Sequence, residues 1–143
     1  MARSIYVVGS SNTDMVVRSK RIPQKGETIL GGDFFMFPGG KGANQAVAAV
    51  RLGGDVTFVA NLGSDLFGEN ALRQFEAEGI HTQYISRDQH NPSGVALINV
   101  DESGENSIVV ASGANNFLSP VQVKSALENA PEHSIVLIQL ETP

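Results

Sequence analysis

Residues 39–54 read Gly39-Gly40-Lys41-Gly42-Ala43-Asn44-Gln45-Ala46-Val47-Ala48-Ala49-Val50-Arg51-Leu52-Gly53-Gly54 and join a glycine-rich turn to a helix-forming run. The apolar residues recur with the i, i+3, i+4, i+7 spacing, which predicts a helix with one buried face that ends at the paired glycines. Lys41 and Asn44 lie in its first turn. Because glycine leaves the backbone accessible and the first N–H groups of a helix lack partners, this junction predicts a polar or anionic ligand site.

Two common phosphate-binding motifs do not fit this stretch. A nucleotide P-loop would need glycine where Phe35 stands and a hydroxyl residue where Gly42 stands. A dinucleotide fingerprint that starts at Gly40 would need glycine at Gln45. The ligand of this turn is therefore expected to be held in another way.

The stretch resembles the first signature of the ribokinase (phosphofructokinase-B type) family of sugar kinases, and the resemblance runs from the first strand to the end of the chain. Relatives that act on fructose phosphates also carry a Gly-Gly-Lys-Gly run, but Asn12 and Glu141 favour an unphosphorylated pentose. Four other segments agree with the family pattern: Ile5-Tyr6-Val7-Val8-Gly9-Ser10 with Asn12 and Asp14; Pro23 with Gly26-Glu27-Thr28; Gly113-Ala114-Asn115; and Gln139-Leu140-Glu141.

Composition limits the function classes. With 143 residues, 41% of them apolar and 17% charged, the chain can bury one core, so one domain is expected. The net charge of −5 and the lack of a basic cluster argue against nucleic-acid and anionic-membrane partners and favour a small metabolite. There are no cysteines, which excludes disulfides and thiolate metal sites. No apolar signal segment precedes the first strand, so we expect a cytoplasmic protein.

Strand and helix patterns alternate, which predicts an α/β fold with a parallel sheet flanked by helices. Residues 5–10, 56–61 and 134–140 are apolar runs typical of strands buried on both faces. Two further helices are expected, one capped by Ser64 or Asp65 and one starting at Ser119-Pro120. Segments with alternating polarity predict a second, half-exposed sheet, in which the last two form a hairpin: residues 13–19, 27–37, 93–101 and 106–111.

The family resemblance implies a ribokinase-like Rossmann-type fold in which this small sheet is a lid over the sugar. It also implies that two lids pack face to face in a homodimer. An exposed apolar lid face would explain why dimerisation is useful.

Asn12 and Asp14 are the first candidate site residues. A lone Asp after a strand is more often a turn or cap residue. However, side chains two positions apart in an extended chain share a face, here beside the carboxyl end of a parallel strand, where open α/β sheets bind ligands. From the residues alone, Lys41 is as consistent with a solvated cation as with a ligand contact.

The resemblance assigns sugar-hydroxyl binding to Asn12, Asp14, Gly40, Lys41, Asn44 and Glu141, and places Ala96 and Ile98 on the lid side of the pocket. The three histidines lack metal-ligand spacing and receive no role, so no metal site is expected in this chain.

Family members continue to a second signature, Gly-Ala-Gly-Asp, which supplies the anion hole and the aspartate base, and this run is absent here. By resemblance, ATP, Mg²⁺ and a monovalent cation such as K⁺ bind in that later part. The chain is therefore expected to be a truncated N-terminal half without catalytic residues.

Two hypotheses remain open. One is a kinase that converts D-ribose to ribose 5-phosphate or acts on another pentose or nucleoside. In this hypothesis the chain is the sugar-binding half of the kinase and is inactive by itself. The other is a stand-alone sugar-binding or dimerisation module. A Gly-Ala-Gly-Asp run in the coding sequence after Pro143 would distinguish them.

Overall fold

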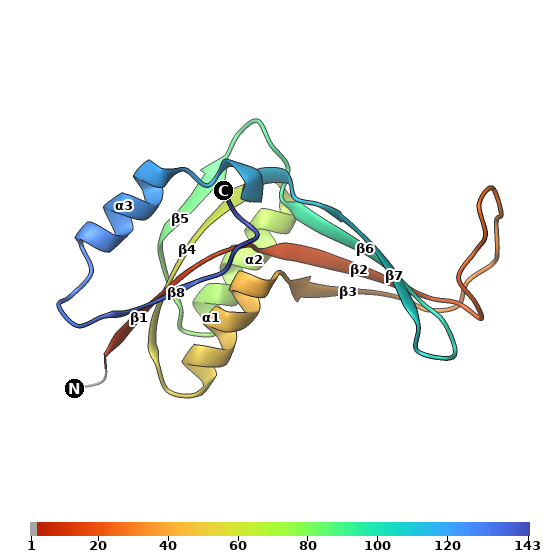
Figure 1. Cartoon of the computed structure of the whole chain (residues 1–143), viewed down its shortest axis with the longest axis horizontal. Coiled ribbons are helices and arrows are strands. Elements are labelled where there is room, and N and C mark those ends of the chain that lie inside the picture. The colour runs from red at the N-terminus through yellow and green to blue at the C-terminus, as the bar shows by residue number, and fades with distance from the viewer. Residues whose placement is uncertain (1–2) are drawn as a thin grey trace.

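The computed structural model describes residues 3–143 and arranges them around two four-stranded sheets (Figure 1). The first sheet is parallel, with the strand order β5-β4-β1-β8. A parallel sheet flanked by helices, with a second small sheet beside it, confirms the predicted α/β class. The strands of the first sheet are β1 (Ser4–Val8), β4 (Asp55–Gly63), β5 (His81–Asp88) and β8 (Ile135–Ile138).

Helices cover both faces of the parallel sheet. Successive side chains of a strand point to opposite faces, so Val7 of β1 packs in one core with α1 (Lys41–Arg51) and α2 (Leu66–Ala77). The neighbouring Val8 packs in a second core with α3 (Pro120–Glu128). Two helices therefore lie on one face and the third on the other.

Helices α2 and α3 begin at the capping residues that the sequence predicts. Asp65 caps α2 by accepting the Gly68 N–H at 2.9 Å, and Ser119 forms a capping box with Gln122 at the start of α3. By contrast, Gly40 at the start of α1 offers no side-chain cap. In residues 3–143 no helix combines the length and the apolar character that crossing a membrane requires.

The outer strands of the parallel sheet differ from expectation. Burial on both faces was predicted for residues 134–140, but Ile135, Val136, Leu137 and Ile138 are 38–62% exposed. The reason is that β8 pairs only with β1 and lies at the sheet edge within the described chain. The opposite edge strand, β5, carries polar residues at many positions, so its sequence did not predict a strand.

The second sheet has the order β3-β2-β6-β7 and extends away from the three helices (Figure 1). The central pair, β2 and β6, is parallel, and the outer pairs are antiparallel, so β6 and β7 form a hairpin. Apolar side chains on this sheet remain exposed, including Met36 at 56% and Val109 at 68%. Its strands are β2 (Asn12–Arg18), β3 (Phe34–Gly39), β6 (Gly94–Val100) and β7 (Asn106–Ala111).

The segment predicted as a strand over residues 27–37 is only partly one, since β3 begins at Phe34. A turn precedes it, in which the Glu27 N–H donates to Gln24 O at 3.0 Å and the Glu27 carboxylate pairs with Arg21. A short 3-10 helix at Gly113–Phe117, which polarity did not predict, connects β7 to α3.

Candidate functional site

The candidate site lies where the two sheets meet. Strand β1 ends at Val8, the chain crosses over through residues 9–11, and β2 begins at Asn12. The first turn of α1 packs directly on this crossover, because the Ala43 N–H donates to Ser10 O at 2.9 Å. The carboxyl ends of β1 and β8, the start of β2 and the start of α1 therefore meet at one place.

The glycines of the 39–42 run are required by contacts within the protein. A Cβ at Gly40, where φ is +91°, would lie 2.6 Å from the Ser11 Cα, and one at Gly42 would lie 2.6 Å from the Gly9 carbonyl carbon. A Cβ at Gly39 would meet a carboxylate instead, 2.2 Å from an oxygen of Asp14. The sequence predicted open backbone for a ligand here, but protein atoms occupy the space beside all three glycines.

Asn12 and Asp14 lie on one face of the second sheet. In the strand register Asn12 pairs with Gly39 and Gly94, and Asp14 pairs with Ala96. Because both neighbours of Asn12 are glycines, the two polar side chains have room above the sheet. Partial burial raises the pKa of the Asp14 carboxyl above its ordinary value.

A polar cluster forms on the other side of the crossover, around Glu141. One carboxylate oxygen of Glu141 pairs with Lys41 Nζ, and the other lies 3.1 Å from Ser10 Oγ. The buried Gln139 accepts the Ser10 backbone N–H at 3.3 Å. The hydrogen bond from Lys41 holds the pKa of Glu141 below its ordinary value, with smaller contributions from Ser10 and Gln139.

The Lys41–Glu141 pair is open to solvent. The side chains of Lys41 and Glu141 are 71% and 40% exposed. Exposed pairs of this kind contribute little to folding stability. Both groups are therefore free to exchange their mutual contact for contacts with a polar ligand, Lys41 as a donor and Glu141 as an acceptor.

The remaining predicted site residues, Ala96, Ile98 and Asn44, have no side-chain hydrogen bond to the two polar pairs. Ala96 is buried beside Asp14, and Ile98, two residues further along β6, pairs with Val16. The backbone of Asn44 donates to Gly40 O at 2.9 Å. Its side chain is hydrogen-bonded to no other described residue, and the residue lines a groove between α1 and α2.

Three residues were quoted in the sequence patterns without a role and have one in this geometry. Ser10 and Gln139 contact the Glu141 cluster, and Asn115 contacts Asn12. Their signal was present in the sequence, since each belongs to a segment that matches the family pattern. The sequence did not show which of these side chains contact each other.

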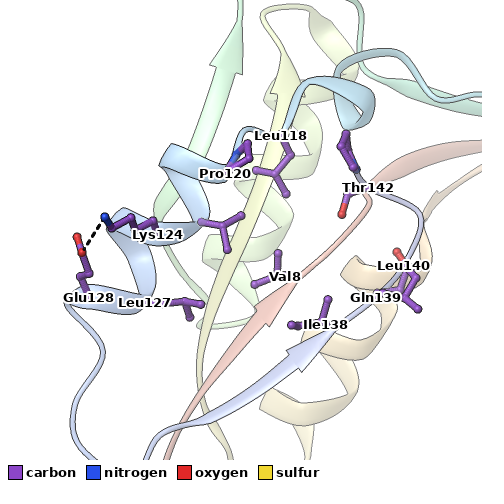
Figure 2. Close-up of a pocket in the computed structure, with 12 residues that line it drawn as sticks. Val8, Leu118, Pro120, Lys124, Leu127, Glu128, Ile138, Gln139, Leu140 and Thr142 are labelled. Carbon is purple, nitrogen blue, oxygen red and sulfur yellow. Dashed lines mark ion pairs between the residues drawn. The ribbon is translucent and has the colours of Figure 1, made fainter.

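An apolar groove of about 750 Å³ lies elsewhere, between α3 and β8 (Figure 2). Figure 2 shows Val8, Leu118, Leu127 and Ile138 around it, with the Lys124–Glu128 ion pair at its outer side. Sugars require several convergent hydrogen-bonding groups, and this lining offers few. Within residues 3–143, His, Asp and Glu side chains form no group of three that could hold a metal ion.

Comparisons with known proteins identify related sugar kinases. The ribokinase of Bacillus subtilis (strain 168) is 47% identical over 141 residues, and the deoxyribokinase of Salmonella typhi is 39% identical over 137 residues. The alignments cover 99% and 96% of this chain but 48% and 45% of those relatives, so the chain spans about half of their length.

A solved structure of Arabidopsis thaliana ribokinase complexed with ribose and ATP superimposes with a TM-score of 0.81 at 34% identity. The match covers 100% of this chain and 47% of that one. The family model described as pfkB family carbohydrate kinase matches residues 2–139. Since that match covers nearly the whole sequence, the chain belongs to the pfkB family of carbohydrate kinases.

Proposed function

We propose that this chain supplies the sugar-binding side of a ribokinase-type enzyme that converts D-ribose and ATP to ribose 5-phosphate. The observation that carries the proposal is that two polar pairs, Asn12 with Asp14 and Lys41 with Glu141, flank the sheet crossover. Together they offer hydrogen-bond donors and acceptors, which neutral sugar hydroxyls need. The 47% identity to a ribokinase supports ribose as the first sugar to test.

In this proposal Asp14 and Glu141 accept hydrogen bonds from sugar hydroxyls, and Lys41 and Asn12 donate to hydroxyl oxygens. Gly40 and Asn44 complete the wall formed by α1, and Ala96 and Ile98 close the pocket from the second sheet, which acts as its lid. The chain would form the N-terminal part of a single ribokinase-like domain. We place the protein in the cytoplasm because ATP is available there.

Phosphoryl transfer depends on positioning and on neutralising charge, so it needs a nucleotide, a metal ion and a base beside the accepting hydroxyl. ATP would supply the phosphoryl group, and Mg²⁺ would neutralise its charge. The family resemblance also implies a monovalent cation such as K⁺. We propose that none of the three is held by residues 1–143. An ADP-release assay with ribose and Mg-ATP should therefore give only background turnover for this chain.

The test of the proposal is ribose binding by the chain itself, followed by calorimetry or by backbone NMR shifts. The Asp14→Ala variant should bind ribose about 10- to 100-fold more weakly, because losing an acceptor that the bound sugar would bury costs about 1–3 kcal/mol. Asp33→Ala is the matched control, since Asp33 is an exposed aspartate directly before β3, at the end of that strand far from Gly39. Equal affinity of the wild-type chain and the Asp14→Ala variant would contradict the proposed role.

A second sugar is favoured by one observation, the 39% identity to a deoxyribokinase over 96% of this chain. Titration with 2-deoxyribose, other pentoses and nucleosides beside ribose separates these substrates. The tightest ligand identifies the sugar. If no sugar binds, the hypothesis that this chain is half of a sugar kinase loses its support. A module that serves only for dimerisation then becomes the better explanation.

We further propose that the chain forms a homodimer through the second sheet. The support is the exposed apolar surface there, where Phe34 and Leu97 are 56% and 55% exposed. Sedimentation at micromolar concentration should show a dimer, and Val109→Asp should shift it to monomer. A wild-type chain that stays monomeric at this concentration would count against the interface.

A further inference from the structure

Asn115 is a buried polar residue that lies behind the candidate site. It belongs to the 3-10 helix between β7 and α3, is 2% exposed, and bonds to residues at the start of β2. Its Oδ1 accepts the Ser11 N–H at 2.9 Å, and its Nδ2 lies 3.0 Å from Ser11 O and 2.9 Å from Ser112 O. A fourth contact joins Asn115 Nδ2 to Asn12 Oδ1 at 2.9 Å.

These contacts fix the direction of both side-chain amides. A backbone N–H can only donate, so the atom of Asn115 that meets the Ser11 N–H must be the oxygen. The Asn115 NH2 group, which has two hydrogens, then faces three oxygens: Ser11 O, Ser112 O and Asn12 Oδ1. An Asn12 NH2 group at the same 2.9 Å would set donor against donor, so the Asn12 oxygen faces Asn115 and the Asn12 NH2 group points away from it.

Gly94 makes this arrangement possible. A Cβ at Gly94 would lie 2.1 Å from Asn12 Oδ1 and 2.3 Å from Asn115 Nδ2. Any side chain there would separate the two amides. The contact is thus built from three parts of the chain: the start of β2, the start of β6, and the 3-10 helix that follows β7.

We propose that Asn115 is a positioning residue that locks the Asn12 carboxamide so that its NH2 group, and not its oxygen, faces the sugar. This inference rests on the sugar-binding function proposed above and deepens it. Asn12 would then present a donor two residues from the acceptor Asp14, on the same face of β2. Such a pair matches two hydroxyl groups of a sugar, one accepting from Asn12 and the other donating to Asp14.

The first variant, Asn12→Asp, tests the orientation and keeps the fold. An aspartate oxygen still accepts from Asn115 Nδ2, but the group turned to the ligand becomes an acceptor instead of a donor. We expect ribose affinity to fall at least about 10-fold with an unchanged melting temperature, since a hydrogen-bond donor is replaced by an unpaired acceptor. Unchanged ribose affinity would mean that the Asn12 oxygen faces the sugar, and would overturn the proposal.

The second variant, Asn115→Ala, tests the route of the effect in a double-mutant cycle with Asn12→Ala. If Asn115 acts through Asn12, Asn115→Ala weakens ribose binding about 10-fold in the wild-type chain and less than about 2-fold in the Asn12→Ala background. Equal losses in the two backgrounds would show a general structural role and refute the inference. Asn116→Ala is the matched control, because Asn116 is the next residue in the chain and its side chain is exposed, outside the contact with Asn12.

A third readout needs no sugar. The side-chain NH2 resonances of Asn12 should show the ordered relaxation of a fixed group in the wild-type chain and become mobile in Asn115→Ala. An equally ordered Asn12 amide in that variant would overturn the proposal even if it bound ribose poorly. If the wild-type chain binds no ribose but this ordering depends on Asn115, the proposed function fails while the positioning contact stands.

Discussion

The substitution Gly42→Ala sets two physical effects against each other. Gly42 is a helical residue in the first turn of α1, and replacing glycine by alanine inside a helix gains about 1 kcal/mol from backbone entropy. Against this, the new Cβ would lie 2.6 Å from both the Gly9 carbonyl carbon and the Ser10 nitrogen, and 2.7 Å from the Gly9 Cα. All three are backbone atoms of the crossover, so no side-chain rotation can relieve the overlap.

The steric effect should win. Forcing one extra carbon into a packed region costs about 1–3 kcal/mol, and contacts with backbone belong at the upper end of that range. After the helix gain is subtracted, we expect a net loss of about 1–2 kcal/mol in the free energy of unfolding. For a chain of this size that loss corresponds to a decrease in Tm of about 3–6 °C.

Thermal unfolding followed by circular dichroism, together with urea unfolding, measures this difference. Gly32→Ala is the matched control, because its new Cβ would lie 3.6 Å from the nearest atom, Arg18 O, which is an ordinary contact. That variant should be neutral or stabilised by up to about 1 kcal/mol through its less flexible unfolded chain. A Gly42→Ala protein at least as stable as wild type would refute the claim that α1 is seated on the crossover at this distance.

Three further perturbations follow from the structure. Phe58→Ala, at a fully buried position in the centre of the parallel sheet, should lower the free energy of unfolding by about 3–5 kcal/mol, as measured by urea unfolding. The backbone N–H of His90 and the neighbouring turn hold the pKa of Asp88 at about 2. The contribution of Asp88 to stability is therefore present at neutral pH and should be lost as the pH drops from about 4 through 2. The Asp88→Asn variant should lose less stability over this pH range. Lys41→Met should raise the pKa of Glu141, followed by carboxyl NMR titration, and an unchanged value would contradict the ion pair.

Local patterns in the sequence predicted much of the framework. Apolar runs and helical spacing predicted the inner strands and three helices because those patterns depend only on backbone periodicity. The caps of α2 and α3 were predictable for the same reason, since a cap acts on N–H groups two or three residues away; the structure selects Asp65 over Ser64 for α2 and has Ser119 for α3. The shared face of Asn12 and Asp14 followed from their spacing alone.

Other features depended on which segments become neighbours. The exposure of β8 and the late start of β3 depend on pairing and on a turn that polarity does not report. Lys41 and Glu141 are 100 residues apart, and only the family resemblance grouped them before the fold was known.

The sequence by itself determined the α/β class, the helix starts and the family, because each is written in short-range spacing or in a contiguous motif. Only the tertiary structure showed that close contacts with protein atoms require glycine at positions 39, 40 and 42. It alone also showed that Asn115 contacts Asn12, 103 residues away in the sequence. The physical reason is that a close approach between distant backbones, and the direction of a buried amide, are fixed by partners that the topology brings together. No local pattern specifies those partners.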